Sequence, residues 1–164
     1  MSPQARLQAG LQAPSGRNMQ TTTFVIVDDP DLVRQIGALH GSNTAVQQAR
    51  AFIACMVDEQ PAAVYEGHSF QVEDCAAAVE NMLLAIHALG LGGVWILSFS
   101  KEAVRETLGI PKDWKIVSLV PFGYYDPDGV SEYKGRKLPN TMVRLRRPLG
   151  DVAFLNSPDE PLEE

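Results

Sequence analysis

The chain has 164 residues, 45% of them hydrophobic and 21% charged, which is typical of a single globular domain with a sizeable core. Its formal net charge of −6 argues against nucleic acid or an anionic membrane as a bulk partner. The longest apolar runs are far shorter than the roughly 20 residues that a membrane helix needs. Cys55 and Cys75 have no C-x-x-C spacing. They are expected to be small buried residues, and the expected location is the cytoplasm.

In chain order, the first elements alternate between helices and short apolar strands. A short helix is predicted over residues 3–12, and a buried strand over residues 24–27. Asp29 and Pro30 are typical of a helix start, since proline suits the first turn and a carboxylate suits its positive end. The next predictions are a polar helix over 44–50, a buried strand over 52–57 and a loop over 58–72. The helix that starts at Pro30 carries its apolar residues on one stripe: Leu32, Val33, Ile36 and Leu39.

The segment from Asp74 to Ser98 is the most informative part of the sequence. Asp74 is expected to cap a helix over 74–89 that is apolar on almost every side. Such a helix must be covered on most sides, either by its own domain or by a second subunit. A subunit interface is the simpler expectation for so short a chain. Glycines end the helix and allow the backbone to approach a flat ligand closely, and a third strand is predicted over 94–97.

The last predicted elements are a helix over 101–108, closed by Gly109 and Pro111, and a strand over 116–122. Strands that are apolar throughout and alternate with helices are typical of a sheet covered on both faces. After Tyr124 the chain becomes polar and basic, without strong periodicity, and is expected to run over the surface of its own domain or of a partner. The sequence therefore predicts one domain over residues 1–155 and an acidic tail over 156–164.

Three blocks of sequence, in the same order, resemble the FMN-dependent nitroreductase family. Ala13–Gln20 is similar to the family's A-P-S-x-x-N-x-Q motif. Residues 74–98 resemble its central dimer helix and G-L-G exit, and residues 108–124 its L-G-I-P turn and last core strand. The resemblance implies an α+β fold, a three-layer α/β/α sandwich around a mostly antiparallel sheet. It also implies a homodimer with two sites at the subunit interface.

The resemblance further implies an NAD(P)H-dependent FMN oxidoreductase. Electrons from NADH or NADPH would pass through FMN to a nitroaromatic, a quinone or a similar small molecule by a ping-pong mechanism. The flavin performs the chemistry in such an enzyme, so no catalytic side chain is expected. No metal site is expected either, because His40, His68 and His87 share no metal-ligand spacing.

The flavin contacts implied by the resemblance come from two parts of the chain. Leu97 and Ser98 would offer mainly backbone groups to the ring. The motif residues would come from the facing subunit: Pro14, Ser15, Gly16, Asn18 and Gln20. Without the other blocks, the Pro-Ser-Gly segment would be interpreted as a simple turn. In the loop over 58–72, the sequence offers His68 for substrate or nicotinamide and Tyr65 and Phe70 for covering the open flavin face, although a lone histidine carries little signal.

For the phosphate, the family's late K-x-R pattern has two matches: Lys134 with Arg136, and Arg144 with Arg146. Spacing does not choose between them, and a solvated basic surface is the alternative for both pairs.

The sequence also departs from the family pattern at two places. It starts after the point where the family carries an R-R-S-x-R type motif, and Thr21-Thr22 replaces the usual Pro-Trp. The alternative function is therefore a non-enzymatic dimer of the same fold that binds a flavin or nucleotide weakly, having lost the phosphate anchor.

Overall fold

A four-stranded antiparallel sheet forms the centre of the computed structural model, which describes residues 3–40, 43–58, 63–133, 136–139 and 146–160. The strand order is β1-β2-β6-β5. The bounds are Thr22–Val27 for β1, Ala51–Asp58 for β2, Leu91–Gly93 for β5 and Trp114–Tyr124 for β6. Two-stranded hairpins lie outside this sheet: β3 (Val64–Tyr65) with β4 (His68–Ser69), and β7 (Val130–Tyr133) with β8 (Arg136–Pro139).

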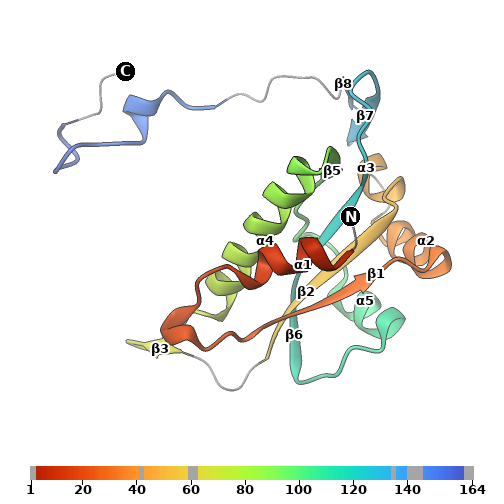
Figure 1. Ribbon diagram of the computed structural model, residues 1–164, viewed down its shortest axis with the longest axis horizontal. Coiled ribbons are helices and arrows are strands. Elements are labelled where there is room, and N and C mark those ends of the chain that lie inside the picture. Colours follow the sequence, from red (N-terminus) through yellow and green to blue (C-terminus); the bar gives the residue numbers. More distant parts are fainter. Residues whose placement is uncertain (1–2, 41–42, 59–62, 134–135, 140–145, 161–164) are drawn as a thin grey trace.

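Helices cover both faces of the sheet (Figure 1). On one face lie α1 (Pro3–Leu11) and α4 (Gln71–Ala88), and on the other α2 (Pro30–Ala38), α3 (Thr44–Gln47) and α5 (Lys101–Leu108). Successive side chains of a strand point to opposite faces. In β2, Phe52 and Met56 accordingly belong to the core beneath α2, α3 and α5, and Ile53 to the core beneath α4. Because both faces are buried, β2 is apolar from Ala51 to Val57, and only its last residue, Asp58, is charged. The predicted three-layer α+β sandwich is confirmed.

The central helix does not begin as predicted. α4 starts at Gln71, with Phe70 at the N-cap position and no side-chain cap. Asp74 lies inside the first turn, where its backbone N–H donates to the Phe70 carbonyl. The prediction that Asp74 caps the helix is wrong because its carboxylate accepts a hydrogen bond from Gly16 of a distant loop instead. The predicted exit is confirmed, since the helix ends at Ala88, followed by Leu89 as C-cap.

The predicted strand over 94–97 is also wrong. β5 spans Leu91–Gly93, and beyond it only an isolated bridge joins Ile96 to Leu119. The Val94 N–H donates to the carbonyl of Pro121 at 3.2 Å. Proline has no N–H with which to return the bond, so the ladder between β5 and β6 is interrupted at this point.

The remaining elements follow their local sequence signals, with two departures. The strand predicted to be buried over 24–27 is only half-buried except at Val27, because β1 is at an edge of the sheet. One predicted helix is shorter. Asp29 caps α2 by accepting the N–H groups of Asp31 and Leu32, each at 3.0 Å. Gly109, with φ +63°, closes α5 as predicted. The helix predicted over 44–50 is only the single turn Thr44–Gln47, and Leu39 follows α2 with 40% of its surface exposed.

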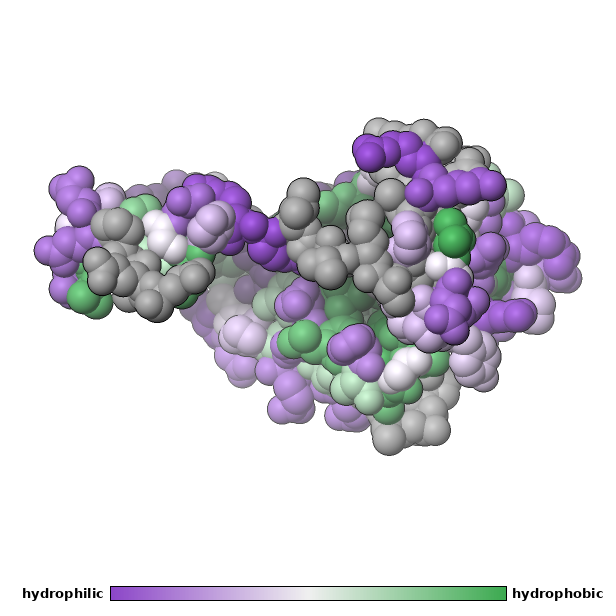
Figure 2. Space-filling model, turned by 90° about the horizontal axis from the view of Figure 1, so that it is seen from above, coloured by the Kyte–Doolittle hydropathy of each residue, from purple (hydrophilic) through white to green (hydrophobic). Residues whose placement is uncertain are grey.

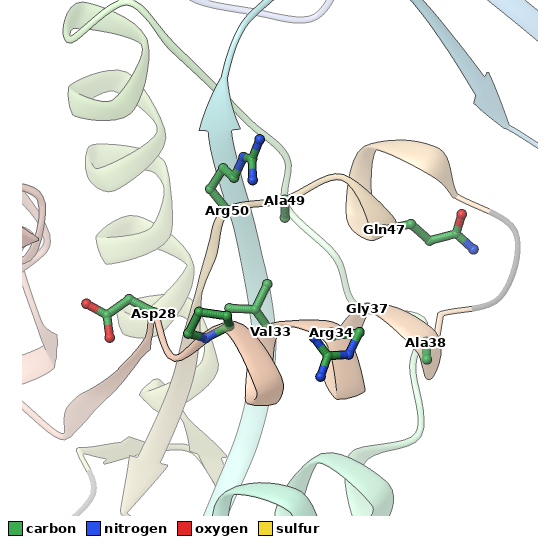
Figure 3. Close-up of a pocket in the computed structure, with 9 residues that line it drawn as sticks. Asp28, Val33, Arg34, Gly37, Ala38, Gln47, Ala49 and Arg50 are labelled. Carbon is green, nitrogen blue, oxygen red and sulfur yellow. The ribbon is translucent and has the colours of Figure 1, made fainter.

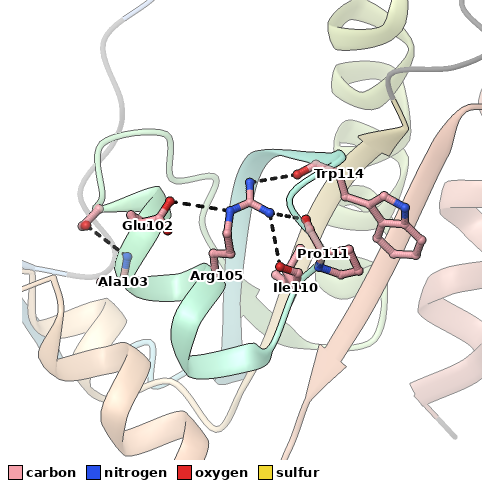
Figure 4. Close-up of polar contacts among 7 residues, drawn as sticks. Glu102, Ala103, Arg105, Ile110, Pro111 and Trp114 are labelled. Atoms are coloured by element: carbon pink, nitrogen blue, oxygen red, sulfur yellow. Dashed lines mark hydrogen bonds and ion pairs between the residues drawn. The ribbon is translucent and has the colours of Figure 1, made fainter.

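Arg105 fastens the turn after α5 to the start of β6 (Figure 4). Its guanidinium donates to the carbonyl oxygens of Trp114 at 2.9 Å, Ile110 at 3.3 Å and Pro111. The side chain is only 15% exposed, and it also lies 3.6 Å from the Glu102 carboxylate. One side chain therefore donates to three carbonyls of the turn, of which that of Pro111 also accepts the Trp114 N–H at 3.2 Å.

Both cysteines are buried and free, as predicted. Cys55 on β2 belongs to the same core cluster as Cys75 on α4. A hydrogen bond with Cys75, together with burial, raises the pKa of the Cys55 thiol well above its ordinary value. The neutral thiol is therefore the form present at physiological pH.

The C-terminal segment, residues 146–160, extends away from the sheet (Figure 1). Seen from above, it projects from the body of the molecule with apolar side chains among polar ones (Figure 2). A short 3-10 helix spans Leu149–Asp151. The apolar side chains of this segment are 46–56% exposed: Leu149, Val152, Phe154 and Leu155.

No helix in the described part of the chain has the length and hydrophobicity to cross a membrane. The division into a domain over 1–155 and a tail over 156–164 stays a prediction.

Candidate functional site

The loop with the first family motif, residues 13–20, joins α1 to β1 and has a tight, irregular backbone. Three residues that are not glycine adopt left-handed conformations: Arg17 (φ 52°), Asn18 (φ 56°) and Gln20 (φ 53°). Each such residue costs of order 1 kcal/mol, and such strain gathers at ligand-binding sites. Within the loop, Ser15 Oγ accepts the N–H of Gln20 at 3.0 Å, and the Ser15 carbonyl accepts that of Asn18 at 2.9 Å.

Gly16 connects this loop to the beginning of α4. Its N–H donates to Asp74 Oδ1 at 2.8 Å, and Asp74 is only 8% exposed. A Cβ atom at position 16 would lie 3.0 Å from the Phe70 ring and 3.1 Å from the Ala63 Cβ, so the loop comes too close for a side chain. The motif loop is therefore packed against α4 and the segment that precedes it.

A small hollow lies beside the motif loop and holds about 110 Å³. Pro14, Ser15, Gln20 and Asp74 line it together with Gly10, Leu11, Ala13, Thr22, Phe24 and Ala78. Sites that enclose a cofactor-sized ligand hold about 300 to 1,000 Å³. The hollow combines polar groups with apolar walls, and at this volume one chain alone does not enclose a cofactor-sized ligand.

Leu97 and Ser98 lie at the opposite edge of the sheet from the motif loop. They follow the bridge of Ile96 to β6, and both are exposed, Leu97 to 58%. The motif loop leads into β1, whereas β5 is at the opposite edge, with β2 and β6 between them. Three strand spacings amount to about 14 Å. Within one chain, the structure does not bring these two groups of predicted site residues together.

The basic residues predicted to hold the phosphate are only partly described, because Lys134 and Arg144 lie outside the described residues. Arg136 begins β8 and is exposed. Its hairpin packs on α3 at the end of the sheet where β6 ends, away from the motif loop (Figure 1). Arg146 is exposed in the extended C-terminal segment. Neither described arginine lies at the motif loop of its own chain.

The β3–β4 hairpin borders the motif loop, which the sequence did not predict. Phe70 contacts Gly16, and its ring lies edge-on to His68 with 5.4 Å between the ring centroids. His68 Nε2 lies 2.7 Å from Glu73 Oε1. The pKa of the Glu73 carboxyl is lowered mainly by a hydrogen bond from its own backbone N–H, and further by the hydrogen bond with His68. Tyr65 is 61% exposed.

A larger cavity, of about 500 Å³, lies between α2, α3 and the start of β2 (Figure 3). None of the predicted site residues lines it. Of its two arginines, Arg34 pairs with Asp31 at 2.5 Å, and Arg50 precedes β2. Among the residues that the structure describes, no group of three or more metal-binding side chains is close enough to hold a metal ion. The candidate site therefore remains the motif loop with the surfaces beside it.

Comparison with known proteins identifies the family. The model of the Nitroreductase family matches residues 41–124, just over half of the chain. A putative NADH dehydrogenase/NAD(P)H nitroreductase of Archaeoglobus fulgidus is 34% identical over 122 residues, which cover 72% of this chain and 69% of that protein. An NADPH-flavin oxidoreductase of Vibrio harveyi is 30% identical over 151 residues, which cover 85% of this chain and 62% of that protein.

Solved structures agree with the sequence matches. The NADPH:FMN oxidoreductase of Vibrio harveyi, complexed with NAD⁺, superposes with a TM-score of 0.75 at 26% identity. The superposition covers 96% of this chain and 69% of that one. The family predicted from the three sequence blocks is thus confirmed, and the chain belongs to the nitroreductase family.

Proposed function

We propose that the chain is an NAD(P)H-dependent oxidoreductase that uses FMN and passes electrons to a small nitroaromatic, quinone or similar acceptor. Membership of the nitroreductase family supports this proposal, as do the names of relatives, which include an NAD(P)H nitroreductase and an NADPH-flavin oxidoreductase. When bound, FMN takes two electrons as hydride from the nicotinamide and gives them to the acceptor. The two substrates then use one pocket in turn, which is a ping-pong mechanism.

The observation that carries the proposal is the separation of the two groups of flavin-contacting residues. The motif loop and Leu97–Ser98 lie at opposite edges of the same sheet. A single ring contacts both groups only where two chains meet, which favours a homodimer with two equivalent sites. In an isologous interface, each chain presents both groups to its partner.

The exposed apolar surface of the chain supports a second copy as the partner. On α4, Leu84 is 60% and Val72 41% exposed, although the helix forms the centre of one layer. The C-terminal segment exposes four more apolar side chains and extends away from the sheet in Figure 1. Burying apolar surface of this kind drives association. We therefore place the dimer contact along residues 75–89, with the C-terminal segment reaching across to the partner.

At this interface, the chain's own residues bind and orient the cofactor. Ser15, Asn18 and Gln20 offer polar groups from one chain, and the backbone at Leu97 and Ser98 offers donors and acceptors from the other. Pro14 and Gly16 shape the loop, and the absence of a side chain at Gly16 leaves room for Phe70 and Ala63. No side chain of the chain need act as acid or base.

For the phosphate, we propose the second basic pair, Arg144 with Arg146, because Arg136 lies at the far end of the sheet from the motif loop. Arg146→Ala is expected to weaken FMN binding about tenfold or more, the effect of one lost charge-assisted hydrogen bond. Arg136→Ala, at an arginine that is also exposed, is expected to change the affinity for FMN less than twofold. Titration of FMN fluorescence at two salt concentrations measures the FMN affinity of both variants. The reverse ranking would assign the phosphate to the first pair.

The experiment that tests the function starts from the purified chain reconstituted with FMN. The expected results are a bound-flavin absorption spectrum and steady-state oxidation of NADH or NADPH when menadione or a nitrofuran is added. A protein that stays colourless after reconstitution would contradict the proposal. Flavin binding without turnover would favour the non-enzymatic alternative.

A further inference from the structure

We propose that Asp74 is a positioning residue of this site, whose carboxylate holds the motif loop in the conformation that receives the cofactor. This inference rests on the proposed function and adds a residue that contacts the loop rather than the reacting atoms.

The contact joins parts of the chain that are 58 residues apart. Asp74 Oδ1 accepts the N–H of Gly16 at 2.8 Å, and the side chain is 8% exposed. Hydrogen bonds to an ionised carboxylate are stronger than neutral ones. The position in the first turn of α4 also places the carboxylate at the positive end of the helix. The bond is therefore part-buried and charge-assisted, and its acceptor is the buried side chain of Asp74.

The motif loop depends on this contact. Among the hydrogen bonds of the described residues, the one that joins residues 13–20 to another part of the chain is the bond from Gly16 to Asp74. The others lie within the loop or link it to the end of α1. The side chains of Arg17 and Asn18 are exposed, so they add little packing. Three strained backbone conformations persist only where the surroundings hold them in place.

The same carboxylate lines the hollow beside Pro14, Ser15 and Gln20. Release of Gly16 is expected to let the loop leave the conformation in which these residues face a ligand. The apparent dissociation constant of the ligand then rises in inverse proportion to the fraction of molecules that keep the competent loop. Asp74 thus links the order of the loop to affinity for FMN.

The experiment compares Asp74→Ala, Asp74→Asn and the control Asp29→Ala in the full chain. Amide hydrogen exchange over residues 14–20 is measured without cofactor, and FMN affinity by titration. Asp74→Ala is expected to speed exchange and weaken FMN binding, each by about tenfold. Asp74→Asn keeps an oxygen that accepts from Gly16 and is expected to restore most of both properties. Asp29→Ala removes the α2 cap on the other face, lowering the melting temperature with both readouts unchanged.

Wild-type exchange or wild-type FMN affinity in Asp74→Ala would overturn the inference, as would equal losses in Asp29→Ala. If Asp74→Ala does not fold, Asp74→Ser, whose hydroxyl is too short to reach Gly16, takes its place. A wild-type chain that binds no FMN would contradict the proposed function. The exchange data would still decide separately whether Asp74 anchors the loop.

Discussion

Leu84→Glu is expected to turn the dimer into monomers and to abolish tight FMN binding. Leu84 is 60% exposed on the outer side of α4, within the segment along which we place the dimer contact. A two-fold symmetric contact contains the same residue from each chain, so the substitution places two glutamate carboxylates in one apolar interface. Burial of an unpaired charge is far more costly than the apolar contact that it replaces. Because the proposed site needs both chains, its affinity for FMN is expected to fall when the dimer dissociates.

Sedimentation velocity at micromolar concentration and the flavin absorbance of the same samples measure this result. Leu39→Glu is the matched control, a leucine that is 40% exposed at the end of α2, on the other face of the sheet. It is expected to leave both the dimer and the flavin unchanged. A wild-type chain that sediments as a stable monomer, or a Leu84→Glu dimer that still holds FMN, would contradict the shared site.

Arg105→Ala is expected to lower the free energy of unfolding by about 3 kcal/mol, because hydrogen bonds from a charged group contribute about 1.5 to 3 kcal/mol each and are not additive. The guanidinium donates hydrogen bonds to three carbonyls of the turn that leads into β6, and the Arg105 side chain is 15% exposed. Its loss removes one hydrogen-bond donor from each of these carbonyls next to β6, and the Pro111 carbonyl keeps only the N–H of Trp114. Urea unfolding followed by circular dichroism measures the change.

Glu102→Ala separates the carbonyl contacts of Arg105 from its ion pair. The Glu102 side chain is 69% exposed and 3.6 Å away, so its removal is expected to cost less than about 1 kcal/mol, as for other surface pairs. Arg105→Lys keeps the charge but loses the planar guanidinium. Its loss of unfolding free energy is expected to lie between those of Glu102→Ala and Arg105→Ala. A loss below 1 kcal/mol in Arg105→Ala would show that the turn is held by packing alone.

Much of the fold follows from local sequence signals. The continuous apolar run of β2 predicts a strand buried on both faces, and Asp29-Pro30 predicts the start of α2. The errors come from partners distant in the sequence. Asp74 has the chemistry of a helix cap, but its carboxylate bonds to Gly16. The strand predicted over 94–97 is interrupted because the residue opposite Val94 is Pro121.

The candidate site is less predictable from the sequence than the fold. The motif loop was recognisable by resemblance, but nothing local to Gly16 or Asp74 indicates that they meet. The nearness of Phe70 to Gly16 depends in the same way on how α4 packs. The distance between the motif loop and Leu97 is set by strand order, which residue patterns do not specify. The proposed site also needs a second chain. How two chains pack depends on the shape and chemistry of their folded surfaces, which the hydrophobic periodicity of the sequence does not specify.

The buried thiol pair has a consequence for chemical durability. Peroxide attacks a thiolate rather than a thiol, and only where it can reach the sulfur. Cys55 and Cys75 have no exposed surface, and the raised pKa of Cys55 keeps that sulfur protonated. The layers that enclose these sulfurs therefore shield them from oxidation by peroxide.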